Sequence, residues 1–321
     1  MGKHYGDILY KSGVDLSSVI LLNEEQKKFG SKCLPLYEKY LENIMQEVKG
    51  MADGLHQKYE DLAFWLFSLY CYEEDHGCSV IAVKTDNDVI VARNMDMFPE
   101  YKKTSESVLY MPENKNTFLA HSTAFISVED GINEHGLSVA LTFLMSKRIK
   151  PGINGGFIVR LLLEECKTTK EAVELLKKLP ISSTHNIVIA DKLGNMVVAE
   201  ICPDDINIIE NDKYVIATNH FVSDKMKKYN NKIHNWYYTN DRYNTLKDYL
   251  ENNEVNFEII KKLISNNYGF VCNYEKSLHF DTIWSAIYSL NTLYNEISEG
   301  NPIKTKYKYD NRLEWGISKK H

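Results

Sequence analysis

Apolar residues recur at helical spacing through the first quarter of the chain. Asn23 stands where a helix cap is expected, and Gln26 occupies the position that completes a capping box. Three- and four-residue steps place one apolar stripe along residues 34–48 and a second along residues 62–70. The glycine-containing stretch 50–54 separates the two stripes. The pattern therefore predicts a helical N-terminal segment that ends near residue 75.

Alternation of apolar and polar residues begins at Ser79 and indicates strands. Val80–Lys84 and Val89–Arg93 flank the short turn 86–88, so they predict a β-hairpin. Further strands are expected at Leu137–Leu144 after a turn at 131–136, and at Asn186–Ala190, Met196–Ile201, Ile206–Ile209, Tyr214–Thr218 and Ile283–Leu290. Helices are expected at Phe157–Cys166, after the cap Thr168, and at about 240–252 and 255–265. This order is typical of a layered α+β fold in which helices cover antiparallel sheets.

The composition is that of a globular chain and excludes several function classes. Apolar residues make up 44% of the 321 residues, and 44 acidic against 38 basic residues leave a net charge of -6. This balance argues against a nucleic-acid-binding protein. No apolar run approaches the roughly 20 residues of a membrane-spanning helix, and the N-terminal residues lack a signal-peptide core. We therefore expect a cytoplasmic protein without membrane association.

The six cysteines are spread along the chain without a Cys-x-x-Cys pair. A structural zinc site needs clustered ligands, and a disulfide framework is usual in small secreted chains. We therefore expect no metal, and we expect most of the thiols to be buried and inert.

Cys78 is the exception among these cysteines. It lies directly after Gly77, where the helical segment gives way to the first strand. Arg93 and Asp96 follow 15 and 18 residues later, at the far end of the predicted hairpin. Because a hairpin returns its far end to its start, we expect both residues to lie beside Cys78. A neighbouring guanidinium favours the thiolate and lowers the pKa of a cysteine. The alternative is a cysteine that only packs in the core.

Several short segments, taken in their order along the chain, resemble a known family. They are Gly77-Cys78, Arg93-Asn94-Met95-Asp96, Gly131-Ile132-Asn133-Glu134-His135-Gly136-Leu137, Asp191 to Glu200, and Thr218-Asn219-His220. The stretch 50–54 and Arg242 on a predicted helix are also similar. The family is that of the cysteine N-terminal-nucleophile (Ntn) amide hydrolases, which includes choloylglycine hydrolases and penicillin V acylases. The chain is most similar to its acyl-CoA:6-aminopenicillanate (isopenicillin N) acyltransferase branch.

The resemblance implies a four-layer αββα sandwich and a precursor that processes itself. Residues 1–77 would form a helical pro-segment, and residues 78–321 the catalytic domain. The Cys78 thiol would attack the Gly77 carbonyl, and water would then release a new N-terminus. The resulting chains of 77 and 244 residues are expected to stay associated, because the helical stripes need a partner surface. The freed α-amine, with a reference pKa near 7.7–8.0, would serve as the base for its own thiol.

The resemblance also assigns roles to individual residues. Cys78 matches the nucleophile, Asp96 the carboxylate that binds its α-amine, and Arg93 the cation beside the thiol. Asn219 matches the side-chain donor to the tetrahedral oxyanion, and Arg242 matches an arginine of the relatives.

Two further residues are expected to bind substrate. Several relatives carry an amide side chain where this chain has Thr142, so a hydroxyl would take its place. His220 follows Asn219 and either lines the site or supports the fold. For His76, and for the basic run 147–150, a functional role and a solvated loop both stay open.

The implied reaction is cleavage or transfer of the acyl group of a linear, non-peptide amide through a Cys78 thioester. A dedicated acyl-CoA-dependent N-acyltransferase of small-molecule biosynthesis is the second hypothesis, and a non-catalytic scaffold with a core thiol is the third. The expected partner is a small-molecule N-acyl amide, with acyl-CoA as an alternative donor. No cofactor and no nucleic acid are expected, and the sequence leaves open whether copies form a homo-oligomer.

Overall fold

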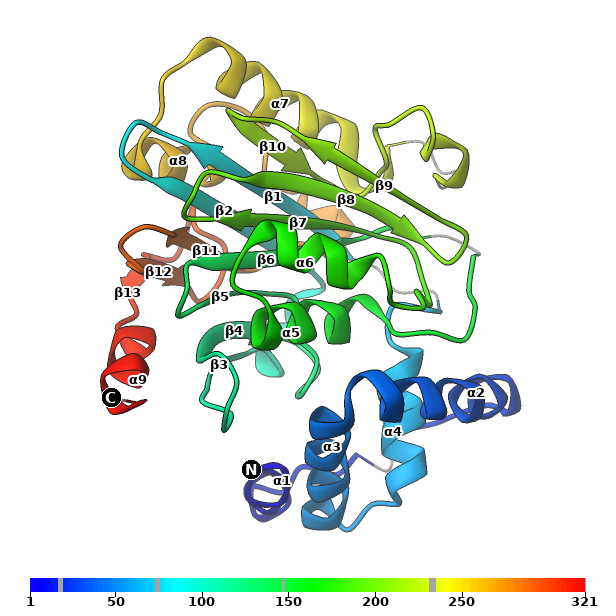
Figure 1. Cartoon of the computed structure of the whole chain (residues 1–321). Coiled ribbons are helices and arrows are strands. Elements are labelled where there is room, and N and C mark those ends of the chain that lie inside the picture. The colour runs from blue at the N-terminus through cyan, green and yellow to red at the C-terminus, as the bar shows by residue number, and fades with distance from the viewer. Residues whose placement is uncertain (17–19, 73–75, 146–147, 231–234, 321) are drawn as a thin grey trace.

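Two antiparallel β-sheets stack face to face at the centre of the molecule, and helices cover both outer faces (Figure 1). The computed structural model describes residues 1–16, 20–72, 76–145, 148–230 and 235–320. The layers follow one another as helices, sheet, sheet and helices. The predicted α+β class and the four-layer αββα sandwich are confirmed.

The first sheet, sheet A, carries the predicted hairpin at its centre. Its strand order is β10-β1-β2-β11-β12-β13, and all neighbours are antiparallel. The strands are β1 Gly77–Lys84, β2 Val89–Met97, β10 Tyr214–Ala217, β11 Asp281–Ser289, β12 Asn295–Ser298 and β13 Lys308–Tyr309. In the hairpin, Gly77 stands opposite Asp96, and Lys84 stands opposite Val89. The hairpin therefore returns Asp96 to the level of Gly77, as the sequence predicted.

The second sheet, sheet B, is a meander in which sequence neighbours are also sheet neighbours, from β3 to β9. Its strands are β3 Glu106–Tyr110, β4 Phe118–Ser122, β5 Asp130–Asn133, β6 Leu137–Phe143, β7 His185–Asp191, β8 Met196–Cys202 and β9 Asp205–Glu210. Strand β5 corrects the sequence analysis, which had assigned residues 131–136 to a turn. Gly131 pairs with Ala120 and Val139 in the middle of the sheet, and the chain turns only after Asn133.

Four helices complete the outer layers. Helices α7 (Thr239–Asn252) and α8 (Phe257–Ile264) lie on sheet A, and α5 (Gly155–Glu165) and α6 (Thr169–Leu176) lie on sheet B. Between the sheets, Val80 and Val91 of sheet A share an apolar core with Val188 of sheet B. Burial of these facing side chains drives the stacking of the sheets.

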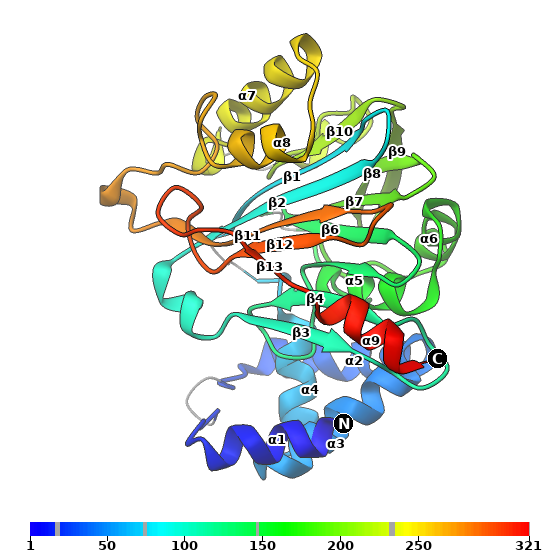
Figure 2. The same cartoon turned by 90° about the vertical axis from the view of Figure 1, so that its left-hand side faces the viewer.

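The N-terminal helices pack outside sheet B and its helices (Figure 2). They are α1 Gly2–Lys11, α2 Glu24–Tyr40, α3 Glu42–Leu55 and α4 Tyr59–Ser68. The predicted capping box of Asn23 and Gln26 is present at the start of α2. These helices share one apolar core with α5 and α6, and Asn154 ties them to it. Its backbone N–H donates to the Tyr37 hydroxyl at 3.0 Å, and its side chain donates to the Leu66 carbonyl at 2.8 Å.

The remaining elements are short. Helix α9 (Arg312–Lys320) lies against β3 and β4, and 3₁₀ turns occur at Pro99–Lys103, Lys227–Tyr229, Trp236–Tyr238 and Lys276–Leu278. Within the described ranges, every helix is too short or too polar to traverse a lipid bilayer.

The sequence indicated that the glycine-containing stretch 50–54 separates two helical stripes. In the structure this stretch lies inside α3 instead. Its glycines let the backbones of α1 and α3 touch. A Cβ atom built on Gly54 would lie 2.4 Å from the Lys3 carbonyl oxygen and 2.6 Å from the Asp7 nitrogen. The helical breaks fall instead at Leu41, between α2 and α3, and at residues 56–58, between α3 and α4.

We expect Gly54→Ala to destabilise the protein. The added methyl meets backbone atoms of α1, which move only if the whole helix moves, so the cost is about 1–3 kcal/mol of unfolding free energy. Urea unfolding measures this change. The matched variant Lys49→Ala removes an exposed side chain of the same helix and should stay within about 0.5 kcal/mol of wild type. Equal stability of the two variants would contradict the close helix contact.

Candidate active site

The side chain of Cys78 lies in the core between the two sheets. Cys78 stands opposite Met95, and Val80 stands opposite Arg93, on the paired strands β1 and β2. Alternate residues of a strand share a face, so Cys78, Met95 and Arg93 meet on the inner face of sheet A. Nη2 of Arg93 and Sδ of Met95 each lie 3.5 Å from the Cys78 sulfur. The structure thus brings the predicted thiol and guanidinium together.

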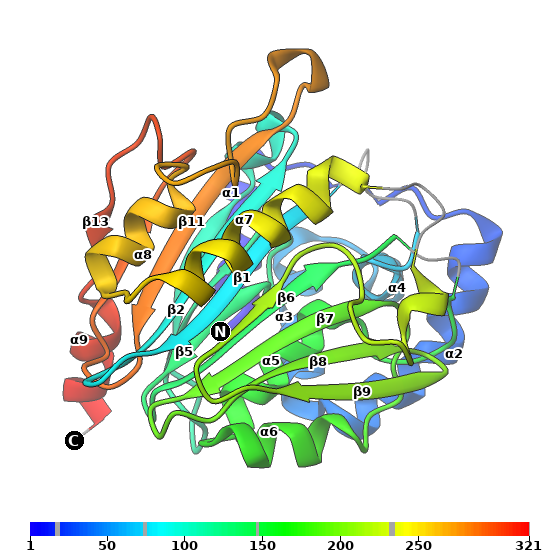
Figure 3. The same cartoon turned by 90° about the horizontal axis from the view of Figure 1, so that it is seen from above.

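A second guanidinium reaches Cys78 from the opposite face of sheet A. Helix α7 lies over β1 (Figure 3) and carries the fully buried Arg242. Nη1 of Arg242 donates to the Cys78 carbonyl oxygen at 2.5 Å and to the Ser79 hydroxyl at 2.9 Å. Cys78 is therefore held between two arginines, one at its sulfur and one at its carbonyl oxygen.

Arg93 is anchored by the buried carboxylate of Asp130 on β5. Nη1 of Arg93 donates to Asp130 at 2.9 Å, and the Trp284 indole donates to the same oxygen at 3.2 Å. Tyr288 and His121 bind the other oxygen. Burial by itself raises the pKa of Asp130, but Arg93 and His121 hold this pKa down at about 2. Asp130 therefore stays ionised and fixes the guanidinium beside the thiol.

Asp96 lies on the helix side of sheet A, where two hydroxyl groups bind it. Tyr274 and Thr282 each donate to one of its oxygens at 2.6 Å, and Nη1 of Arg242 is 4.0 Å away. A β-bulge between Thr282 and Trp284 turns the first toward Asp96 and the second toward the inter-sheet space. Burial raises the pKa of Asp96, although Arg242 and the two hydroxyls act to lower it.

Asn219 follows β10 and contacts the backbone of Cys78. Its Oδ1 accepts from the Cys78 N–H at 2.9 Å and from Nη2 of Arg242 at 2.7 Å. Its Nδ2 donates to the Phe143 carbonyl at 2.8 Å. In the intact chain this amide nitrogen is thus engaged, and its role as oxyanion donor stays a prediction.

The pKa of the Cys78 thiol is not lowered, although the neighbouring Arg93 led us to expect this. Cys78 is completely buried, and burial raises the pKa of its thiol. Arg93 lowers that pKa as expected, whereas the carboxylates of Asp96 and Glu129 raise it. The expected lowered pKa is therefore wrong for the intact chain, because the sequence argument counted the guanidinium and not the loss of water.

Thr142 and His220 bind the segment that carries Asn219. The Thr142 hydroxyl donates to the Thr218 carbonyl at 2.5 Å. Nδ1 of His220 lies 2.8 Å from the Thr239 hydroxyl and 3.1 Å from the Thr218 hydroxyl. In the intact chain both residues therefore position Asn219, and their contact with substrate stays a prediction.

Gly77 is held in the extended strand β1 by close neighbours. A Cβ atom at this position would lie 2.9 Å from the Phe280 ring and 3.2 Å from the Cβ of Asp96. The residue before Cys78 must therefore lack a side chain because space is short. The backbone here is regular strand, paired with Asp96.

Sequence reasoning missed three residues that hold the predicted groups. Asp130 anchors Arg93, and Tyr274 and Thr282 bind Asp96. Asp130 directly precedes the segment Gly131–Leu137 that carried part of the family resemblance, which was an available signal. For Tyr274 and Thr282 the sequence offers none, because they are more than 170 residues from Asp96.

Two candidates that the sequence left open are now placed. His76 is 3% exposed, and its ring lies 5.6 Å from that of Tyr70 and 5.5 Å from that of Phe143, so the solvated-loop interpretation is wrong. In the basic run, Arg148 and Lys150 pair with Asp204, which favours a surface role. Lys147 lies outside the described residues.

The described residues contain no group of three or more His, Cys, Asp or Glu side chains arranged to hold a metal ion.

The buried His185 and the half-buried His220 lead us to expect a loss of stability in mild acid. Burial lowers the pKa of His185 to about 3 and that of His220 to about 4, with Arg242 adding to the effect on His220. Unfolded histidine titrates near 6.5, so below that pH only the unfolded chain binds these protons. The unfolding free energy should fall by roughly 1.4 kcal/mol per histidine and pH unit, until the folded pKa is reached.

Urea unfolding between pH 7 and pH 5 tests this expectation. His185→Gln should flatten the pH dependence, whereas His4→Asn, at an exposed position, should leave it unchanged. A slope that is the same in wild type and His185→Gln would show that His185 does not contribute.

Comparison with known proteins gives a family match and two similar folds. The family model of acyl-coenzyme A:6-aminopenicillanic acid acyl-transferase matches residues 83–304, about two thirds of the chain. Penicillin V acylase from Agrobacterium tumefaciens is 18% identical over 72% of this chain and 85% of that one, with a TM-score of 0.51. A mutant of conjugated bile acid hydrolase from Clostridium perfringens is 15% identical over 73% and 93%, with a TM-score of 0.55.

No curated protein sequence matches the chain. At the identities of the two structures, the likeness supports the fold alone. The family match begins after Cys78, so the placement of the nucleophile rests on the geometry around it.

Proposed function

Because the chain belongs to the acyl-coenzyme A:6-aminopenicillanic acid acyl-transferase family, we propose that it is a self-processing cysteine amide hydrolase. Cys78 cleaves or transfers the acyl group of a linear, non-peptide amide. The observation that carries this proposal is the position of Cys78, with Arg93 at its sulfur and Arg242 at its carbonyl oxygen.

The first step cleaves the chain itself. The Cys78 sulfur attacks the Gly77 carbonyl carbon, the bond to the Cys78 nitrogen breaks, and the thiol proton passes to that nitrogen. Water then hydrolyses the thioester, which leaves a carboxylate on Gly77 and a free thiol and α-amine on Cys78. The lack of a side chain on Gly77 keeps its carbonyl accessible to the sulfur on the next residue.

The processed residue then supplies both nucleophile and base. Its α-amine takes the thiol proton, and Arg93 stabilises the thiolate that attacks the substrate carbonyl. Asn219, whose Oδ1 accepts from the Cys78 nitrogen in the intact chain, is the expected donor to the oxyanion once the chain is cut. Losing one such donor typically costs about 3–4 kcal/mol of transition-state stabilisation. Water or an amine finally takes the acyl group from the sulfur.

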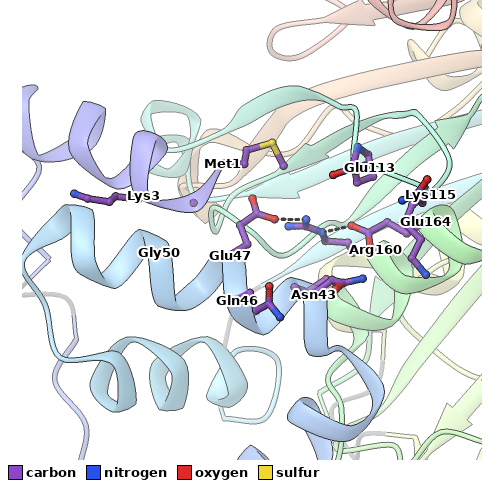
Figure 4. A pocket seen from close by; sticks show the side chains of 14 residues that line it. Met1, Lys3, Asn43, Gln46, Glu47, Gly50, Glu113, Lys115, Arg160 and Glu164 are labelled. Atoms are coloured by element: carbon purple, nitrogen blue, oxygen red, sulfur yellow. Dashed lines mark hydrogen bonds and ion pairs between the residues drawn. The ribbon is translucent and has the colours of Figure 1, made fainter. Parts of the chain in front are cut away.

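Charged and apolar contacts favour continued association of the two chains after the cut. A cavity of about 630 Å³ separates α1 and α3 from α5, and a buried ion-pair cluster closes one side of it (Figure 4). There Arg160 of α5 donates to Glu164 at 2.9 Å and pairs with Glu47 of α3. Because the pair to Glu47 joins segments on either side of residue 77, it holds the small chain to the large one.

Hydrolysis and transfer differ in the molecule that takes the acyl group from the Cys78 sulfur, which is water in the first case and an amine in the second. The family description favours transfer from acyl-CoA as the second candidate. Processed protein is incubated with a panel of N-acyl amides and with acyl-CoA, each with and without amine acceptors. Free acid as the main product identifies a hydrolase, whereas a new amide formed from acyl-CoA identifies a transferase. Neither product from any donor would contradict the proposed function.

A further inference from the structure

Tyr70, seven residues before the Gly77–Cys78 bond, is held in a strained backbone conformation. Its φ angle is 61°, in the left-handed region that bulky residues rarely adopt. Its side chain is buried at 2% exposure. Such strain persists only where the surroundings hold a residue in place.

Tyr70 fills a socket that matches a phenol. Its hydroxyl donates to Oε1 of Glu129 at 2.7 Å, and its ring centroid lies 6.3 Å from that of Phe143 and 5.8 Å from that of His185. Gly156 and Ser127 close the ring edge, since a Cβ on Gly156 would lie 3.1 Å from Tyr70 Cε2 and 3.2 Å from Ser127 Oγ. We call these neighbours the Tyr70 socket: Ser127, Glu129, Phe143, Gly156 and His185.

The socket contains hydrogen-bonding atoms that Tyr70 does not bind. Among the described residues, Ser127 Oγ, Glu129 Oε2 and His185 Nδ1 are buried without a hydrogen-bond partner. Glu129 is fully buried. Nearly all buried polar groups in native proteins are paired, so three unpaired atoms around one side chain indicate a place built for a polar ligand.

The socket is linked to the site around Cys78, because the carbonyl of Phe143 accepts from Asn219, whose Oδ1 binds the Cys78 N–H. Glu129 directly precedes Asp130, whose carboxylate binds the Arg93 that contacts the Cys78 sulfur. The charge of Glu129 also raises the pKa of that thiol. Tyr70 lies on the N-terminal side of the Gly77–Cys78 bond, which is the side that becomes the acyl part of the thioester during processing.

We infer that the Tyr70 socket is the acyl subsite, and that it takes a flat apolar acyl group ending in a hydroxyl or N–H donor. A hydroxyphenyl group is the type case, with Glu129 as acceptor. This inference rests on the proposed function, because hydrolysis places Tyr70 among the last eight residues of the small chain. The substrate then displaces the phenol, which had occupied its place in the precursor.

Small phenols test the socket in the uncut chain, independently of any catalysis. The double variant Cys78→Ala with Tyr70→Gly removes a group equivalent to 4-methylphenol. By calorimetry it should bind 4-methylphenol roughly tenfold or more tightly than 4-methylanisole, because only the phenol donates to the carboxylate. Cys78→Ala alone, with Tyr70 in place, should bind neither. Equal affinities for the two probes would overturn the inference.

Kinetics of the processed wild-type enzyme give a second test that needs no cavity variant. The value of kcat/KM for a 4-hydroxyphenylacetyl amide should exceed that for the 4-methoxyphenylacetyl amide by roughly tenfold, and Glu129→Gln should reduce this ratio. Equal values in wild type would overturn the acyl assignment. Mass spectrometry of the cut reports separately on processing, so a failed subsite is distinguished from a failed proposed function.

Discussion

Replacing Cys78 with alanine is expected to leave the chain uncut and without activity on amides. Denaturing mass spectrometry should show one species near 37.2 kDa for Cys78→Ala, and chains of 77 and 244 residues for wild type. The methyl side chain has no atom that can attack the Gly77 carbonyl. Activity of the variant should fall by a factor of about 1,000 or more, as for other nucleophile deletions.

Cys33 provides the matched control for this experiment. It is as completely buried as Cys78 but lies on α2, and Cys33→Ala should be cut like wild type. Cleavage of Cys78→Ala at the Gly77–Cys78 bond would contradict self-processing. A wild-type chain that keeps one mass and turns over no amide would instead favour the scaffold hypothesis, in which Cys78 is a core thiol.

Arg160→Met is expected to weaken the attachment of the helical segment to the rest of the molecule. Arg160 is 2% exposed and stands between Glu47 and Glu164, with the Tyr110 ring 4.5 Å from its guanidinium carbon. Removing it leaves the buried carboxylate of Glu164 and the half-buried one of Glu47 without their cation. Breaking such a pair costs about 3–5 kcal/mol. Urea unfolding should show this loss, and size-exclusion chromatography of processed protein should show release of the small chain.

Arg148→Met is the matched control, because it makes the same substitution at an exposed position. Its side chain is 61% exposed and pairs with Asp204 at the surface, so the change should be within about 1 kcal/mol. Glu47→Gln should also weaken the attachment, because it removes the partner on the helical segment while the Arg160 side chain remains. An Arg160→Met protein with wild-type stability, and with its chains still together, would contradict the assigned role of this cluster.

Local signals in the sequence predicted most elements around the site. The Asn23 cap, the alternation on both sides of residues 86–88, and the Thr168 cap each depend on contacts a few residues apart, and each is present. The hairpin also sufficed to place Arg93 beside the Cys78 sulfur, because register and alternation follow from its short turn.

Elements that depend on distant partners escaped the sequence analysis. Helix α1 was not predicted, because its contact with α3 depends on the close approach of Gly54 to the backbone of Lys3, about 50 residues away in the sequence. Strands β3, β4 and β5 were likewise missed, and Gly131, which suggests a turn when seen alone, lies in the middle of sheet B. In each case, packing against a distant segment overrides the local preference.

Two features could be derived from the sequence alone. The order of its motifs indicated the family and the layered fold, and the short hairpin placed a thiol, a cation and a carboxylate near residue 78. Only the tertiary structure determined the direction in which the thiol pKa shifts and the side chains that hold these groups in place. Burial of the sulfur raises the pKa of the Cys78 thiol. Asp130 of sheet B binds Arg93 of sheet A, and Arg242 of helix α7 donates to the Cys78 carbonyl oxygen. The physical reason is that desolvation and long-range pairing depend on which surfaces meet, and the local sequence does not specify these.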